Sequence, residues 1–398
     1  MRTWAARCGF ALLIAAAAIN LAAGVALALG DPGRASDLRV MYDWCRAWLI
    51  DGHSLYVGAD ASADYPPNAV VLLSPIALVP ERWLVPLWTA GAVLLAPVLP
   101  WLVMRAASKR RGLTRAVPAL LFLCWAAPRT LLQFSMLSMT LACVALLLAD
   151  ERARPAGIAL GLALFKPQIA APIALWMLLT GRLRTLVTAG AVVLAGWALY
   201  DSRIGESPFT TAVGWLRVLE SEYAGAAGLV GHTSIRGWAL IAASDPVTAD
   251  VLWISASTIL LACVWLAARR ARSLALDAGG LAVPAVFCLW SLLVTYHNGN
   301  NLVLMLPAFA FLWFHDDRAP LGLRWILIGA TEFAMAFDVP VRLAHAAGGG
   351  WARAAIEHFD RAFALTVLAY LSAWCIGVTP RSRRARVSAA AGGEQLRR

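Results

Sequence analysis

Hydrophobic runs recur along nearly the whole chain, and only short polar segments separate them. A helix needs roughly 20 apolar residues to cross the hydrocarbon core of a bilayer. Of the 398 residues, 61% are hydrophobic and only 14% are charged, a composition that leaves no room for a separate soluble domain. The pattern therefore predicts an all-α polytopic membrane protein.

The predicted spans are residues 8–29, 83–104, 115–127, 130–149, 185–200, 250–268, 280–296, 301–314, 323–338 and 362–378. Residues 68–79 are too short to span and end at Pro80, so we expect a juxtamembrane or re-entrant helix there. Residues 156–180 are interrupted by Lys166, Pro167 and Gln168, which predicts two half-depth helices meeting at Lys166. With these two, the total is about twelve membrane helices.

The basic residues fall in the polar segments between the spans, for example in residues 105–115, 269–272 and 381–398. By the positive-inside rule these segments are cytoplasmic, and so are both termini. The formal charge of +11 is therefore explained by membrane topology and by contact with anionic lipid, and it does not indicate nucleic-acid binding. We expect one membrane domain over 1–380 in the cytoplasmic (inner) membrane and a disordered basic tail over 381–398.

The residues between Ser36 and Pro67, called the first polar segment below, fall on the outer side in this topology. Six aspartates lie between Asp31 and Asp64. The apolar positions after Asp37 recur at helical spacing, which predicts a helix lying along the membrane. Asp37 could cap that helix, or it could act as a general base at the lipid–water boundary.

Lys166 lies within apolar sequence, where an unpaired ammonium is costly. It could snorkel to an interface or pair with an acid such as Glu332. Its position between two short helices also suits a group that binds phosphate in a cavity.

His297 follows a predicted span and has asparagines beside it. A hydrogen-bonded structural histidine is one interpretation, and a group that holds phosphate or sugar hydroxyls is the other. For Gln133 a helix-to-helix hydrogen bond is the default explanation. The seven cysteines show no metal or disulfide spacing, and we expect neither a metal site nor a cofactor.

The order of these elements resembles glycosyltransferase family 87. The shared pattern runs from Asp37 through a Gly-x-x-x-Tyr element (52–56), Tyr-Pro-Pro (65–67), Gln133 and Lys-Pro-Gln (166–168) to Tyr-His (296–297). The match departs from the family where Leu-Gln-Phe-Ser surrounds Gln133 and where Asn301 replaces an aspartate.

The resemblance implies the GT-C fold with juxtamembrane helices in the first outer loop. It also implies an inverting transfer of a sugar, with mannose expected, from a polyprenyl-phosphate donor to a lipid or glycan acceptor outside the membrane. Asp37 would be the base, and Lys166, His297, Gln168, Tyr65 and Gln133 would bind the donor phosphate or sugar. A transporter or flippase of a lipid-linked sugar is the alternative, because broken helices and a buried lysine suit both classes.

Overall fold

The computed structural model describes residues 2–31, 35–58, 61–107, 131–223, 234–243, 245–271, 280–295, 299–314 and 359–377. Within these ranges every regular element is a helix, as the sequence predicts. The basic tail 381–398 and the predicted spans 115–127 and 323–338 lie outside them.

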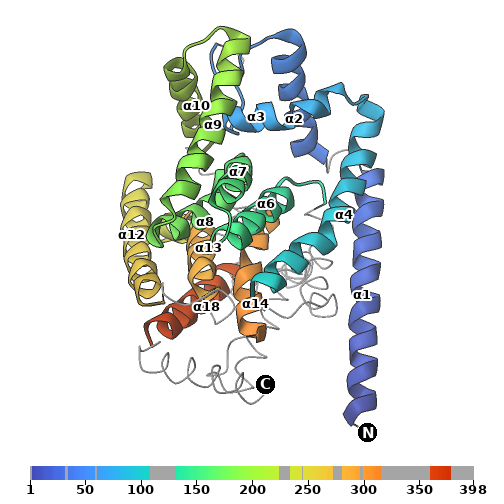
Figure 1. Cartoon of the computed structure of the whole chain (residues 1–398), viewed down its shortest axis with the longest axis vertical. Helices are drawn as coiled ribbons and strands as arrows, with labels where there is room; N and C mark the ends of the chain where they lie inside the picture. The colour runs from blue at the N-terminus through green and yellow to red at the C-terminus, as the bar shows by residue number, and fades with distance from the viewer. Residues whose placement is uncertain are drawn as a thin grey trace.

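The α-helices are α1 (Arg2–Gly30), α2 (Ser36–Arg46), α3 (Pro67–Leu73), α4 (Glu81–Ala107), α6 (Ser135–Leu148), α7 (Ala153–Ala163), α8 (Pro167–Leu179), α9 (Leu183–Ile204), α10 (Pro208–Tyr223), α11 (Arg236–Ala242), α12 (Pro246–Ala271), α13 (Ala282–Val294), α14 (Leu306–Phe314) and α18 (Phe359–Ile376). A π-helical turn, Ala47–Asp51, extends α2, and 3₁₀ turns cover Ser74–Leu78 after α3 and Gly299–Met305 before α14. Helix α1 runs along the long axis at one side of the molecule, and α12 lies at the opposite side (Figure 1).

Three of these helices, α4, α9 and α12, are long and apolar enough to cross a membrane, judged by length and composition. Shorter apolar helices occur at several other predicted spans, including Ser135–Leu148 and Ala282–Val294. The described residues therefore fit a helical membrane protein, while the total of about twelve membrane helices stays a prediction.

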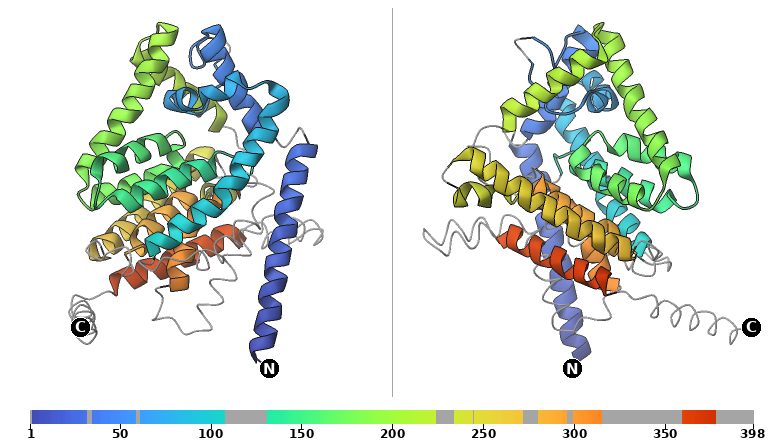
Figure 2. Two further views of the ribbon diagram at one scale, coloured as in Figure 1. Left: turned by 45° about the vertical axis from the view of Figure 1, so that its right-hand side comes forward. Right: turned by 90° about the vertical axis from the view of Figure 1, so that its left-hand side faces the viewer.

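One end of the molecule contains the first polar segment, α3, α10 and the C-terminal end of α9 (Figures 1 and 2). The helices α13, α14 and α18 pack below them, and the N-terminus of α1 lies at the opposite end (Figure 2). The buried apolar residues form two clusters that follow this arrangement. The larger cluster is centred on α13, and the smaller one lies around the first polar segment. The second cluster forms the base on which the candidate site is built.

The break in residues 156–180 forms as predicted. Helix α7 ends at Ala163, and Pro167 opens α8, where its missing N–H costs no helical hydrogen bond. Helix α7 packs closely on α9 because Gly157 and Gly161 have no side chain. A Cβ atom at Gly157 would lie 2.4 Å from the Cβ of Thr188. This packing places the turn that carries Lys166 beside the first polar segment.

Residues 201–248 lie between the predicted spans 185–200 and 250–268, and they contain α10 and α11. This stretch mixes charged and apolar positions, and no apolar run within it reaches the length of a span, so the hydrophobic pattern predicts no membrane helix there. Helix α10 matters most for function, because it packs directly against the first polar segment.

Candidate functional site

Helix α2 has one buried face, formed by Leu38, Met41 and Cys45, as the helical spacing predicts. Burial raises the pKa of the Cys45 thiol to about 12, so this cysteine is an inert packing residue. The N-cap residue of the helix is Ala35, and no side chain caps this end. The capping role considered for Asp37 is therefore wrong, and its carboxylate is available for other contacts.

Asp37 lies in the first turn of α2, where the positive end of the helix dipole stabilises a carboxylate. The Nε2 atom of Gln133 donates a 2.8 Å hydrogen bond to Asp37 Oδ2. The other carboxylate oxygen, Oδ1, accepts a longer hydrogen bond of 3.3 Å from the Ser36 hydroxyl. Gln133 precedes α6, so this contact links residues 96 positions apart.

Lys166 occupies the N-cap position of α8 and is 4% exposed. Its Nζ atom lies 5.7 Å from the centroid of the Tyr65 ring, within the range of a cation–π contact. The carboxylates of Asp37 and Asp64 both attract this ammonium. The ring, the two acids and the ammonium are called the charged group below, and the ring and the acids offset part of the cost of burying the positive charge.

Tyr65 is held on two sides. The hydroxyl of Tyr56 donates a 2.7 Å hydrogen bond to the Tyr65 carbonyl, and the Tyr65 ring packs edge-on against Phe134, with centroids 5.9 Å apart. The indole Nε1 of Trp215, on α10, donates a 2.9 Å hydrogen bond to the carbonyl of Asp64. The segment Asp64–Tyr65 is thus fixed from both faces.

The end of α9 anchors the part of the first polar segment that precedes Tyr56. The Leu55 backbone N–H donates to the Tyr200 hydroxyl at 2.9 Å, and Trp48 Nε1 donates to the Tyr200 carbonyl at 3.3 Å. The rings of Trp48 and Tyr200 stack with centroids 5.8 Å apart. Sequence reasoning missed Tyr200, because a tyrosine at the end of a span also fits simple anchoring at the interface.

The remaining sequence candidates have different outcomes. The backbone carbonyl of Gln168 accepts a 3.0 Å hydrogen bond from the Ser291 hydroxyl, and no hydrogen bond among the described residues involves its side chain. His297 lies outside the described residues. Asn301 is 4% exposed and accepts a 2.6 Å hydrogen bond from Ser135, which is a contact between helical elements. The structure thus brings together Asp37, Gln133, Tyr65 and Lys166, and adds Asp64.

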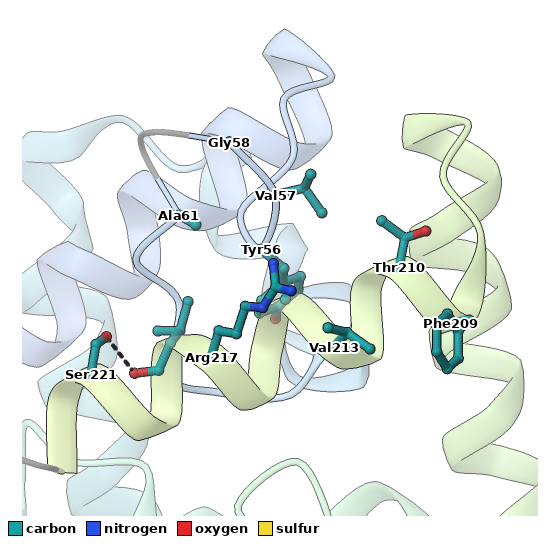
Figure 3. Close-up of a pocket in the computed structure, with 11 residues that line it drawn as sticks. Tyr56, Val57, Gly58, Ala61, Phe209, Thr210, Val213, Arg217 and Ser221 are labelled. Carbon is teal, nitrogen blue, oxygen red and sulfur yellow. Dashed lines mark hydrogen bonds between the residues drawn. The ribbon is translucent and has the colours of Figure 1, made fainter.

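A cavity of about 450 Å³ lies between residues 56–58 and 61 on one side and one face of α10 on the other (Figure 3). Arg217 extends across it towards Tyr56, and Phe209 and Thr210 stand at the N-terminal end of α10 (Figure 3). Tyr56 lines this cavity and also holds Tyr65, so the cavity and the charged group share one wall. No group of three potential metal ligands occurs within the described ranges.

These features define a helical membrane protein with a carboxylate, an amide and a buried ammonium gathered at one end. A family model described as glycosyltransferase family 87 matches residues 64–295, more than half of the chain. The chain belongs to glycosyltransferase family 87 and is a membrane glycosyltransferase. The match includes Tyr65, Gln133 and Lys166, whereas Asp37 precedes it. No curated protein and no solved structure matches the chain.

Proposed function

We propose that the protein transfers a sugar, with mannose expected, from a polyprenyl-phosphate donor to a lipid or glycan acceptor on the outer side of the cytoplasmic membrane. The observation that carries this proposal is the group formed by Asp37, Gln133 and Lys166 in a chain of a glycosyltransferase family. It contains a base and a cation, which are the two charged groups that such a reaction needs.

Asp37 acts as the general base in this proposal. An acceptor hydroxyl attacks the anomeric carbon of the donor, and Asp37 takes the hydroxyl proton as the new C–O bond forms. The bond between the anomeric carbon and the phosphate oxygen breaks, and the phosphate leaves with the bonding electron pair. Because attack comes from the side opposite the phosphate, the anomeric configuration inverts.

Lys166 stabilises the leaving phosphate. An ammonium in a site shielded from water interacts with developing negative charge far more strongly than one in solution. Tyr65 supports this role because its ring holds the ammonium at 5.7 Å without neutralising it. His297 and Gln168 are proposed to contact the same donor headgroup, on the strength of the family resemblance.

We place the further sugar units of the acceptor in the cavity beside α10. Its volume of about 450 Å³ is within the range of sites for small ligands, roughly 300–1,000 Å³. The guanidinium of Arg217 and the hydroxyls of Thr210 and Ser221 offer polar contacts to a glycan, and Phe209 offers an exposed ring. Ala61, at the edge of this cavity, precedes Tyr65 by only four residues.

The decisive experiment uses purified protein in liposomes, radiolabelled polyprenyl-phosphate mannose and a membrane lipid extract as the source of acceptor. Asp37→Asn should abolish the appearance of label in a new product, because an amide cannot take the proton. Asp43→Asn, at an exposed position on the same helix, is the matched control and should retain transfer. Full transfer by the folded Asp37→Asn protein would refute the base, and flipping of the donor without any new linkage would favour a flippase.

A further inference from the structure

Within the described residues, only one end of the Gln133 amide has a hydrogen-bond partner. A carboxylate accepts hydrogen bonds and cannot donate them, so the NH₂ group of Gln133 must be the end that faces Asp37 Oδ2 at 2.8 Å. The carbonyl oxygen Oε1 is therefore fixed on the other side of the amide plane. This oxygen is buried and has no hydrogen-bond donor among the described residues.

Buried polar atoms without a partner are uncommon in native proteins, and each calls for a physical explanation. The side chains of Leu132 and Phe134, the residues on either side of Gln133, are buried and apolar and offer no donor. Lys166 is engaged with the Tyr65 ring instead, and no hydrogen bond joins it to Gln133. Among the described residues, the oxygen without a partner therefore lies next to the proposed base.

Asp37 and Gln133 together present two acceptor oxygens on adjacent side chains. The Asp37 atom Oδ1 meets only the Ser36 hydroxyl, at 3.3 Å, and Gln133 Oε1 meets no donor within the described part of the chain. Two hydroxyls on neighbouring carbons of a sugar or cyclitol ring present two donors side by side. One hydroxyl would give its proton to Asp37, and its neighbour would donate to Gln133.

We propose that Gln133 determines acceptor specificity by accepting a hydrogen bond from the hydroxyl next to the attacking one, so that the acceptor presents a vicinal diol. This inference rests on the proposed function, in which Asp37 is the base. Gln133 then has two separable roles, because its NH₂ group orients the Asp37 carboxylate and its carbonyl oxygen selects the diol. Binding requires a small movement of the amide, since the oxygen is covered in this structure.

The experiment separates these roles with matched ligands and two readouts. The ligands are methyl α-mannopyranoside, methyl α-glucopyranoside and myo-inositol, each compared with its singly deoxygenated analogues. The first readout is inhibition of transfer from radiolabelled polyprenyl-phosphate mannose to a membrane lipid extract. The second is binding of the same ligands to purified protein without donor, followed by intrinsic tryptophan fluorescence.

For the wild type we expect at least one diol to bind and inhibit about tenfold better than the analogue that lacks one hydroxyl of the pair, as for the loss of one hydrogen bond in a shielded site. Gln133→Met has a similar shape without either polar atom, and it should bind both members of the pair equally. The control Thr140→Val removes only a hydrogen bond within α6 and should keep the wild-type difference.

The two readouts also distinguish failure of this inference from failure of the proposed function. A wild type that transfers sugar but treats every diol and its deoxy analogue alike overturns the inference alone, as does a Gln133→Met protein that keeps the wild-type difference. A wild type that discriminates between the ligands in binding, with discrimination lost in Gln133→Met, supports the inference even if no transfer occurs. In that case only the proposed function fails.

Discussion

Gly214 of α10 lies against the backbone of Tyr56. A Cβ atom built on Gly214 would lie 2.1 Å from the Tyr56 carbonyl oxygen and 3.2 Å from its Cβ atom. No side chain fits at this point, so the close approach of the two segments depends on a glycine. Because the Tyr56 hydroxyl donates a hydrogen bond to the Tyr65 carbonyl, the position of α10 affects the position of Tyr65 in the candidate site.

The first prediction concerns Gly214→Ala. The added methyl must displace α10 or the backbone at Tyr56, and overpacking of this kind costs about 1–3 kcal/mol. We expect a lower midpoint of thermal unfolding in detergent, together with reduced transfer. Gly190→Ala is the control, since nothing lies within 4 Å of a Cβ atom there, and alanine favours the helix. Equal midpoints for the two variants would contradict the close contact.

The second prediction concerns Lys166. Lys166→Met keeps the length of the side chain and removes its charge, so donor binding should weaken by at least about tenfold, as expected for a lost hydrogen bond to a charged group. Lys166→Arg should restore part of the affinity because it retains the positive charge. The measurement is the KM for polyprenyl-phosphate mannose, with the KM for acceptor as reference. Unchanged donor KM in folded Lys166→Met would remove the phosphate role.

The third prediction tests the cavity beside α10. Arg217 is exposed and contributes no ion pair within the described chain, so Arg217→Gln should leave stability almost unchanged. If the acceptor lies in the cavity, this variant raises the KM for acceptor several-fold and leaves the KM for donor unchanged. Glu220→Gln, on the same helix but outside the cavity lining, serves as control. A normal acceptor KM in Arg217→Gln would exclude the cavity from the acceptor path.

Features encoded within a short stretch of sequence were predictable. The helical spacing of Leu38, Met41 and Cys45 indicates α2, and the proline after Lys166 indicates the turn between α7 and α8. In both cases the signal comes from residues within one or two turns of each other. The residues Asp37, Gln133, Tyr65 and Lys166 could be selected for the same reason, since each is unusual beside its immediate neighbours.

The contacts among those residues could not be predicted. The hydrogen bond from Gln133 to Asp37 joins two segments whose relative position depends on the packing of α3, α4 and α6. The spacing of residues along the sequence does not predict this packing. In the sequence Asp64 is only the last of six aspartates that begin at Asp31, and the fold alone brings its charge near Lys166. Helix α10 could not be predicted because its mixture of charged and apolar residues resembles that of a polar loop.

The anchoring of the first polar segment on α9 and α10 has a consequence for biogenesis. The ribosome makes Asp37 early, but Tyr200 follows the Leu55 that it holds by 145 residues, and Trp215 follows Asp64 by 151. A nascent chain that ends before Trp215 lacks the indole that holds the Asp64 carbonyl. The contacts that hold Asp64 and Tyr65 in place can therefore be completed only after more than half of the chain has been made.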